Sequence, residues 1–232
     1  MMKKIAAAVA TASTLGFAGL AQAEAFATPI GELDVSMTAT IASQYIWRGQ
    51  SQTDGRGAVQ ASLDIGHESG LYAGIWGSNV DAEDFEGASV EIDYYVGFAG
   101  EITDNFSYDL SWAAYEFPKG FETVYEVLGS VGFYGATLGA KYAYEPSSSL
   151  YLHAGYGFEF DNGIGLGLHY GVTDPRRSDD KYADWAVTVG KTVLGLDLAL
   201  MYSDTDIGSS DCGYVSSRSC GSNWTVSASK TF

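Results

Sequence analysis

The chain has little proline, few basic residues, only two cysteines and, beyond its N-terminus, no long apolar run. Twelve Lys and Arg residues oppose 29 Asp and Glu residues, which gives a formal net charge of −17. A surface this acidic disfavours nucleic acid and anionic lipid as electrostatic partners. The absence of an apolar run and of a helical hydrophobic period excludes a transmembrane helix. Glycine, with 29 residues, and tyrosine, with 16, are abundant instead.

The N-terminal segment has the features of a secretory signal. Two lysines precede a small apolar stretch at residues 5–20, and the sequence Ala-Gln-Ala at 21–23 fits the small-residue rule for cleavage. We expect cleavage after Ala23, so that residues 1–23 are a signal peptide and residues 24–232 form a single domain.

The rest of the chain alternates between apolar and polar residues with a period of two. At the C-terminus, for example, Trp224, Val226 and Ala228 share one face, and Thr225 and Ser227 share the other. Such alternation predicts strands, and segments of about 10–15 residues can cross a bilayer at a tilt of about 45°. The twelve predicted strands are 33–48, 57–67, 70–79, 88–101, 105–116, 121–132, 136–145, 149–160, 163–172, 182–192, 195–204 and 222–232.

The connections between these segments alternate in length. Those after even-numbered segments are minimal, such as 68–69, whereas most of the others are longer and more polar, such as 205–221. Short periplasmic turns and longer outer loops are typical of outer-membrane proteins, and only a closed barrel leaves no unpaired edge in hydrocarbon. We therefore predict an all-β, closed, antiparallel up-and-down transmembrane barrel of twelve strands in the outer membrane of a Gram-negative bacterium; a periplasmic β-sandwich is the alternative. Aromatic residues at strand ends are expected to form its lipid-facing girdle, namely Tyr45, Trp47, Tyr170, Trp185, Tyr202, Trp224 and Phe232.

Two motifs carry a resemblance to a known family. They are Tyr-Ile-Trp-Arg-Gly-Gln-Ser-Gln at 45–52 and Gly-Leu-Tyr-Ala-Gly-Ile-Trp-Gly-Ser-Asn-Val at 70–80. With them the chain resembles the TorF-type porins of Proteobacteria, outer-membrane β-barrels formerly described as conserved proteins of unknown function. The resemblance spans the chain after the signal and implies a channel with no established substrate and no functional residues to carry over. The terminal Phe232 is similar to the signal read by the β-barrel assembly machinery, which is therefore an expected partner during biogenesis.

The predicted inward face combines glycines with charged residues. Carboxylates dominate it, and a wall of that sign favours cations, unless the carboxylates are only structural. Arg48 is expected at the outer mouth, either in an ion pair with a lumen carboxylate or as a guide for solutes. Another four residues are expected to form a row at a constriction: Lys141, His153, His169 and Asp184. The candidate channel-lining residues are therefore Arg48, Asp64, Asp93, Asp109, Lys141, His153, His169 and Asp184.

These features predict a porin-like channel for passive diffusion of small polar solutes or ions, leaning towards cations. The alternative is a non-conducting structural or adhesive barrel that acts through its outer loops. A lumen plugged by the predicted inward residues Tyr72, Trp76, Tyr95 and Tyr115 would favour this alternative. The chain has three histidines and no serine in a recognisable nucleophile motif. We therefore expect that the protein is not an enzyme and that it has no catalytic, cofactor or metal site.

Cys212 and Cys220 lie in the longest predicted loop. An even pair this close in an exported chain predicts a disulfide, in an outer loop that folds into the mouth. The other expected partners are outer-membrane lipid, lipopolysaccharide and small polar solutes, with no nucleic acid, and the protein is expected to be a monomer.

Overall fold

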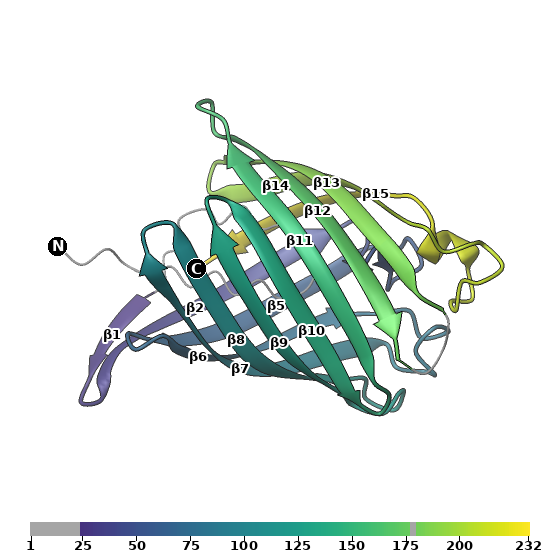
Figure 1. Ribbon diagram of the computed structural model, residues 1–232, viewed down its shortest axis with the longest axis horizontal. Coiled ribbons are helices and arrows are strands. Elements are labelled where there is room, and N and C mark those ends of the chain that lie inside the picture. The colour runs from purple at the N-terminus through teal and green to yellow at the C-terminus, as the bar shows by residue number, and fades with distance from the viewer. Residues whose placement is uncertain (1–23, 177–179) are drawn as a thin grey trace.

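The computed structural model describes residues 24–176 and 180–232, so the predicted signal peptide lies outside the described residues. In this part of the chain, twelve antiparallel strands close into a barrel (Figure 1). β2 (Gly31–Ala42) closes it by pairing with both β5 (Ala58–His67) and β15 (Asn223–Thr231). Between β5 and β15 each strand pairs with the next along the chain: β6 (Leu71–Asn79), β7 (Val90–Thr103), β8 (Phe106–Glu116), β9 (Val124–Phe133), β10 (Ala136–Glu145), β11 (Ser149–Glu159), β12 (Ile164–Pro175), β13 (Tyr182–Val193) and β14 (Leu196–Thr205). The predicted fold class is confirmed.

Eleven of the twelve predicted strands agree with the observed ones to within three residues at each end. The first prediction, 33–48, is wrong at its C-terminal end, because β2 ends at Ala42 and the chain then leaves the barrel wall. The prediction also lacks three short strands, β1 (Glu24–Thr28), β3 (Ile46–Trp47) and β4 (Gln50–Ser51). Among the described residues, no helix is long and apolar enough to span a membrane.

The two ends of the barrel differ in the connections they carry. The C-terminus lies at the end with the short turns, where β1 and the start of β2 form a hairpin that extends beyond the barrel (Figure 1). Two of these turns, Tyr134-Gly135 and Leu194-Gly195, have positive φ at both residues, 48° and 81° in the first and 54° and 75° in the second. This conformation matches the twist of two antiparallel strands, and glycine adopts it without strain.

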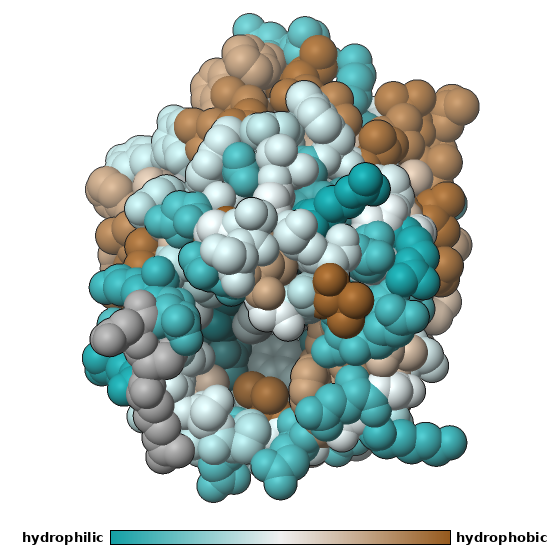
Figure 2. All heavy atoms as spheres, turned by 90° about the vertical axis from the view of Figure 1, so that its right-hand side faces the viewer, coloured by the Kyte–Doolittle hydropathy of each residue, from teal (hydrophilic) through white to brown (hydrophobic). Residues whose placement is uncertain are grey.

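The outward face of the barrel is apolar. Val59, Leu110 and Leu138 each expose 60% or more of their surface, which an aqueous environment would disfavour over so wide an area. Seen from the end with the longer connections, apolar side chains lie mainly at the periphery, and a hollow with both polar and apolar side chains at its rim opens beside the loops (Figure 2). This distribution is the one expected of a barrel that contacts lipid.

Two aromatic clusters lie on this outward face near the longer connections. In one, Tyr202 lies between Trp185 and Trp224, with ring centroids 5.4 and 4.9 Å apart, as expected of girdle residues. In the other, which was not predicted, Tyr125 stacks between Trp112 and Tyr144 at 5.8 and 6.0 Å. Trp112 Nε1 donates a hydrogen bond of 2.8 Å to the hydroxyl of Tyr144.

Inside the barrel, aromatic side chains lie along the wall because glycines face them on neighbouring strands. Tyr72 pairs with Gly97 and Tyr95 with Gly74 in the register of β6 and β7. Each ring occupies the space that a Cβ atom on its glycine partner would need. His153 lies in the same way over its glycine partner on β10.

Hydrogen bonds fix these rings in place. The Tyr72 hydroxyl donates to Oδ2 of Asp109 at 2.7 Å, and the Tyr95 hydroxyl donates to Oδ1 of Asp64. Both tyrosines are therefore held on the wall by a carboxylate two strands away, because β7 lies between β6 and β8 and β6 lies between β5 and β7. Their inward position was predicted. Because glycines lie opposite them, the two rings lie along the wall and leave space in the lumen, whereas the alternative prediction had them plug it.

A Gly97→Ala substitution tests this packing. Its Cβ would enter the space of the Tyr72 ring and lie 2.8 Å from Cβ of Ser111. We expect the free energy of unfolding to fall by about 1–3 kcal/mol, the usual effect of overpacking. Gly157→Ala is the matched control, since its Cβ would meet nothing within 4 Å, and its effect should stay within about 0.5 kcal/mol. Urea unfolding in lipid vesicles measures both, and equal stability of the two variants would contradict the packing.

Candidate functional site

Residues 44–53, between β2 and β5, fold into the barrel and are termed the strap. All of them are buried except Trp47, which is partly buried. β3 and β4 form a hairpin in the strap, and its two turn residues, Arg48 and Gly49, have positive φ of 47° and 78°. The predicted girdle position of Tyr45 and Trp47 is wrong, because both side chains pack inside. Tyr45 is 4% exposed and its ring lies 5.3 Å from that of Trp76.

An ion pair holds the tip of the strap against the opposite wall. Arg48 Nη2 lies 2.5 Å from Oε1 of Glu126 on β9, and the two side chains are 4% and 1% exposed. In the order of strands around the barrel, β9 is five places from β2 in one direction and seven in the other. The strap therefore crosses the lumen. An ion pair with a lumen carboxylate was one of the two predictions for Arg48, and the structure has it.

Other groups complete the environment of the buried charges. The Tyr115 hydroxyl donates to Oε2 of Glu126 at 3.0 Å. The guanidinium of Arg48 lies 4.1 Å from the ring centroid of Trp47 and 4.4 Å from that of Tyr151, so two aromatic faces stabilise it. Removing one partner of such a buried pair costs about 3–5 kcal/mol, because the other charge is left uncompensated.

Glutamine side chains fix the rest of the strap to the wall. Gln44 Nε2 donates to the carbonyl oxygen of Trp224 on β15 at 3.0 Å, and Gln50 Nε2 donates to the hydroxyl of Tyr182 on β13 at 2.6 Å. Within the strap, Gln52 N donates to the carbonyl oxygen of Tyr45 at 2.7 Å. The strap is thus anchored near both ends as well as at its tip.

The connection between β6 and β7 covers the strap from outside. Tyr45 belongs to a buried apolar cluster with Ala58, Val80, Phe85 and Ala88. Asp81 N donates to the carbonyl oxygen of Gln52 at 2.8 Å, and the Phe85 ring stacks on Phe117 with centroids 4.9 Å apart. These contacts close one side of the mouth.

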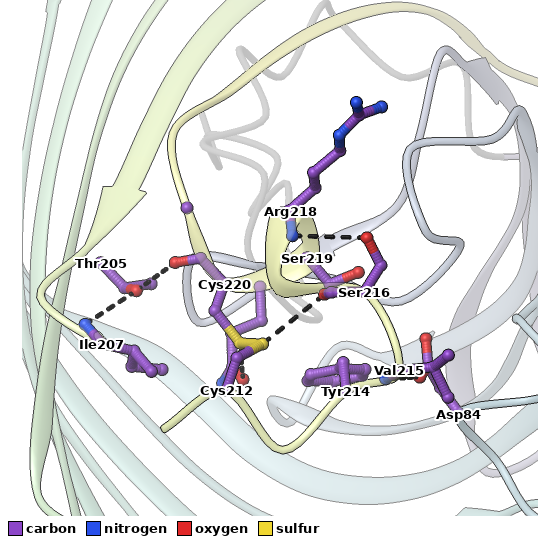
Figure 3. Close-up of a disulfide and its surroundings, with 12 residues drawn as sticks. Asp84, Thr205, Ile207, Cys212, Tyr214, Val215, Ser216, Arg218, Ser219 and Cys220 are labelled. Carbon is purple, nitrogen blue, oxygen red and sulfur yellow. Dashed lines mark hydrogen bonds between the residues drawn. A yellow bond between two sulfur atoms is a disulfide. The ribbon is translucent and has the colours of Figure 1, made fainter. Parts of the chain in front are cut away.

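The connection between β14 and β15 adds a second layer. The disulfide Cys212–Cys220 is present, as predicted, and Cys220 ends the short helix η1 (Ser217–Cys220) (Figure 3). Tyr214 in the same loop donates from its hydroxyl to Oε1 of Gln52 in the strap at 3.0 Å. The bridged loop therefore packs against the strap.

A hydrogen bond from backbone to side chain joins the two covering loops (Figure 3). Val215 N donates to Oδ1 of Asp84 at 2.6 Å. Burial raises the pKa of Asp84, and the hydrogen bond from Val215 opposes that shift.

The strap borders a cavity of about 240 Å³ inside the barrel. Of the eight predicted channel-lining residues, all but Asp64 line it, and Asp64 accepts a hydrogen bond from Tyr95, which does. The structure thus brings these residues together in one space, while their part in conduction stays a prediction. In the described ranges, no group of three or more His, Cys, Asp or Glu side chains is arranged to hold a metal ion.

The predicted row at the constriction runs diagonally across the strands. The His153 and His169 rings stack with centroids 6.0 Å apart, and His169 Nε2 lies 3.0 Å from Oδ1 of Asp184. Lys141, however, pairs in register with Tyr151 rather than with His153. The Tyr151 hydroxyl lies 2.7 Å from His169 Nε2 and donates to Asp184 Oδ1 at 3.2 Å.

Comparison with known proteins gives the family. Residues 26–232 match the family described as "Bacterial protein of unknown function (Gcw_chp)". The chain belongs to the Gcw_chp family. No curated protein matches it in sequence.

Solved structures show what the Gcw_chp barrel resembles. The KdgM porin superposes with a TM-score of 0.55 at 8% identity over 85% of this chain and 99% of that one. The NanC porin gives a TM-score of 0.55 at 8% identity over 85% and 98%. A KdgM porin in complex with disordered oligogalacturonate gives 0.55 at 6% over 85% and 98%. At this identity the likeness shows the fold, a twelve-strand porin-like barrel that is consistent with a bacterial outer membrane.

Several residues of the site in this Gcw_chp family member were not predicted. Tyr151, Gln50 and Gln52 were missed, although the alternation that places His153 inward also places Tyr151 inward. The strap had one signal in the sequence: three consecutive apolar residues at 45–47 interrupt the alternation of the first predicted strand.

Trypsin cleavage after Arg48 tests the anchoring of the strap. In the natural protein this arginine is 4% exposed and should resist cleavage, whereas Arg56, with a 66% exposed side chain, should be cut. Glu126→Ala removes the partner of Arg48. We expect trypsin to cleave after Arg48 at least about tenfold faster in this variant, because the buried ion pair no longer holds the arginine. Glu159→Ala, on an exposed residue, is the control. Peptide mapping by mass spectrometry follows both sites, and resistance at Arg48 in the Glu126→Ala variant would contradict the anchoring.

Proposed function

We propose that the protein is an outer-membrane channel through which small polar solutes or ions diffuse passively, with a preference for cations. The observation that carries this proposal is the cavity inside the closed barrel, which ionisable side chains line. The hollow in Figure 2 and the likeness to two proteins named as porins support it. The TorF-type assignment made from the two motifs is part of the same proposal.

The preference for cations follows from the charges that line the cavity. Asp93, Asp109 and Asp184 supply negative charge. Arg48 and Lys141 supply positive charge, and Arg48 is already engaged in an ion pair. The remaining wall is therefore more negative than positive, which favours cations.

The ligand seen with one of the similar porins is not expected to bind this chain. One of the KdgM structures is a complex with oligogalacturonate, which is a polyanion. A cavity with more carboxylates than cationic groups repels a polyanion, so we do not extend this ligand to the present chain.

A non-conducting barrel that acts through its outer loops is the second candidate. The observation that favours it is the covered mouth, where the strap and two loops pack around the apolar cluster of Tyr45 and Phe85. An ordered outer surface of this kind suits adhesion or an envelope role.

The proposed setting is the outer membrane of a Gram-negative bacterium, with the chain as a monomer. Lipid and lipopolysaccharide would contact the apolar outward face, and the β-barrel assembly machinery would insert the chain. Small polar solutes would be the partners of the lumen. We propose no nucleic acid partner, no cofactor and no enzymatic activity.

Single-channel recording in a planar bilayer tests the proposal. The refolded protein should give conductance steps, and the reversal potential under a salt gradient should show cation selectivity. Arg48→Ala is expected to raise the conductance and to raise the cation-to-anion permeability ratio severalfold, because Glu126 is left without its partner. Arg218→Ala, at an exposed position in η1 of the bridged loop, is the control. Absence of conductance steps would refute the channel, and anion selectivity would refute the charge argument alone.

A further inference from the structure

The cavity separates its charged groups onto different parts of the wall. Asp93 on β7 and Asp109 on β8 line one part, and Lys141 on β10 lines another, with Asp184 on β13 also in the lining. Lys141 is within electrostatic reach of Arg48, Glu126, Asp93 and Asp184, in that order of strength. Even so, no hydrogen bond or ion pair joins Lys141 to Asp93 or to any other group in residues 24–176 and 180–232. Opposite charges therefore face the same space without touching.

Polar atoms at the two sides also lack partners. Asp93 is 2% exposed and Arg48 is 4% exposed. Oδ1 of Asp93 and Nε of Arg48 are both buried without a hydrogen-bond partner in the described chain. Buried polar atoms are normally satisfied, so the wall at both residues has unmet hydrogen-bonding capacity. One of the two atoms is an acceptor and the other a donor, and both residues line the cavity.

We propose that the cavity binds small zwitterions that carry one ammonium and one carboxylate group, as α-amino acids do. The ammonium donates to Asp93, and the carboxylate accepts from Lys141. The inference rests on the proposed channel function and names the class of solute that the channel selects.

Size and charge separate this class from others. The cavity of about 240 Å³ holds several times the volume of about 30 Å³ that a water molecule takes, which suits a solute of a few heavy atoms. A singly charged solute satisfies one side of the cavity and meets like charge at the other. A neutral solute of the same shape leaves both charges unpaired, and unpaired buried charge is unfavourable.

Four solutes of six heavy atoms each separate the charge states: alanine, alaninamide, lactate and lactamide. Isothermal titration calorimetry on the full-length mature protein, refolded in detergent at pH 7, measures the affinity for each. Alanine should bind at least about tenfold more tightly than each of the other three, a difference of about 1.4 kcal/mol. If any one of lactamide, lactate or alaninamide bound as tightly as alanine, the proposal would be overturned.

Two substitutions assign the two charges. Asp93→Asn should remove the preference for alanine over lactate, and Lys141→Gln should remove the preference over alaninamide. Glu159→Gln, on an exposed residue, should leave both preferences unchanged. Heat-modifiable migration on gels confirms that each variant is folded. If a variant does not fold, the comparison of the four solutes on the natural protein still decides the proposal.

Conductance recorded from the same preparation separates this inference from the proposed function. Conductance steps without a preference for alanine would overturn the zwitterion site and leave the channel standing. A preference for alanine without conductance steps would overturn the channel, while the site itself would stand.

Discussion

The ion pair between Arg48 and Glu126 is the interaction on which the shape of the lumen depends. It joins residues 78 positions apart in the chain, from a segment that leaves β2 to a strand almost opposite it in the barrel. Charges this deeply buried are stable only when they are paired and hydrogen-bonded, and here Tyr115 and two aromatic faces complete the pair. Because its tip is fixed, the strap provides a rigid surface against which the outer loops pack.

A second constraint is the match between inward aromatics and glycines. A barrel of twelve strands has a narrow interior, and large side chains would fill it if they stood away from the wall. Gly74 and Gly97 allow the rings of Tyr95 and Tyr72 to lie flat, and carboxylates anchor their hydroxyls. The cavity is the space that remains between this wall and the strap. Its charges are therefore held by rigid elements, which gives the lumen a fixed electrostatic pattern.

The barrel could be predicted from the sequence because a lipid-facing strand imposes strict alternation, and the alternation also placed most of the charged lining residues inside. The strap could not be predicted in this way. Tyr45 and Trp47 stand at alternate positions, so they fit an outward girdle as well as an inward cluster. Only the contacts with Phe85 and Trp76, which are distant in sequence, decide between the two. Tyr151 was missed for a related reason, since its role arises from the diagonal register that brings it to His169.

The coupling free energy between Arg48 and Glu126 tests the central claim most directly. Urea unfolding in lipid vesicles of the natural protein, Arg48→Ala, Glu126→Ala and the double variant gives this quantity as a double-mutant cycle. If the pair fixes the strap, the two substitutions are not additive, and the coupling should reach about 1–3 kcal/mol, the upper part of the range for residues in contact. Additive effects within about 0.5 kcal/mol would contradict the account, because the two residues would then contribute independently.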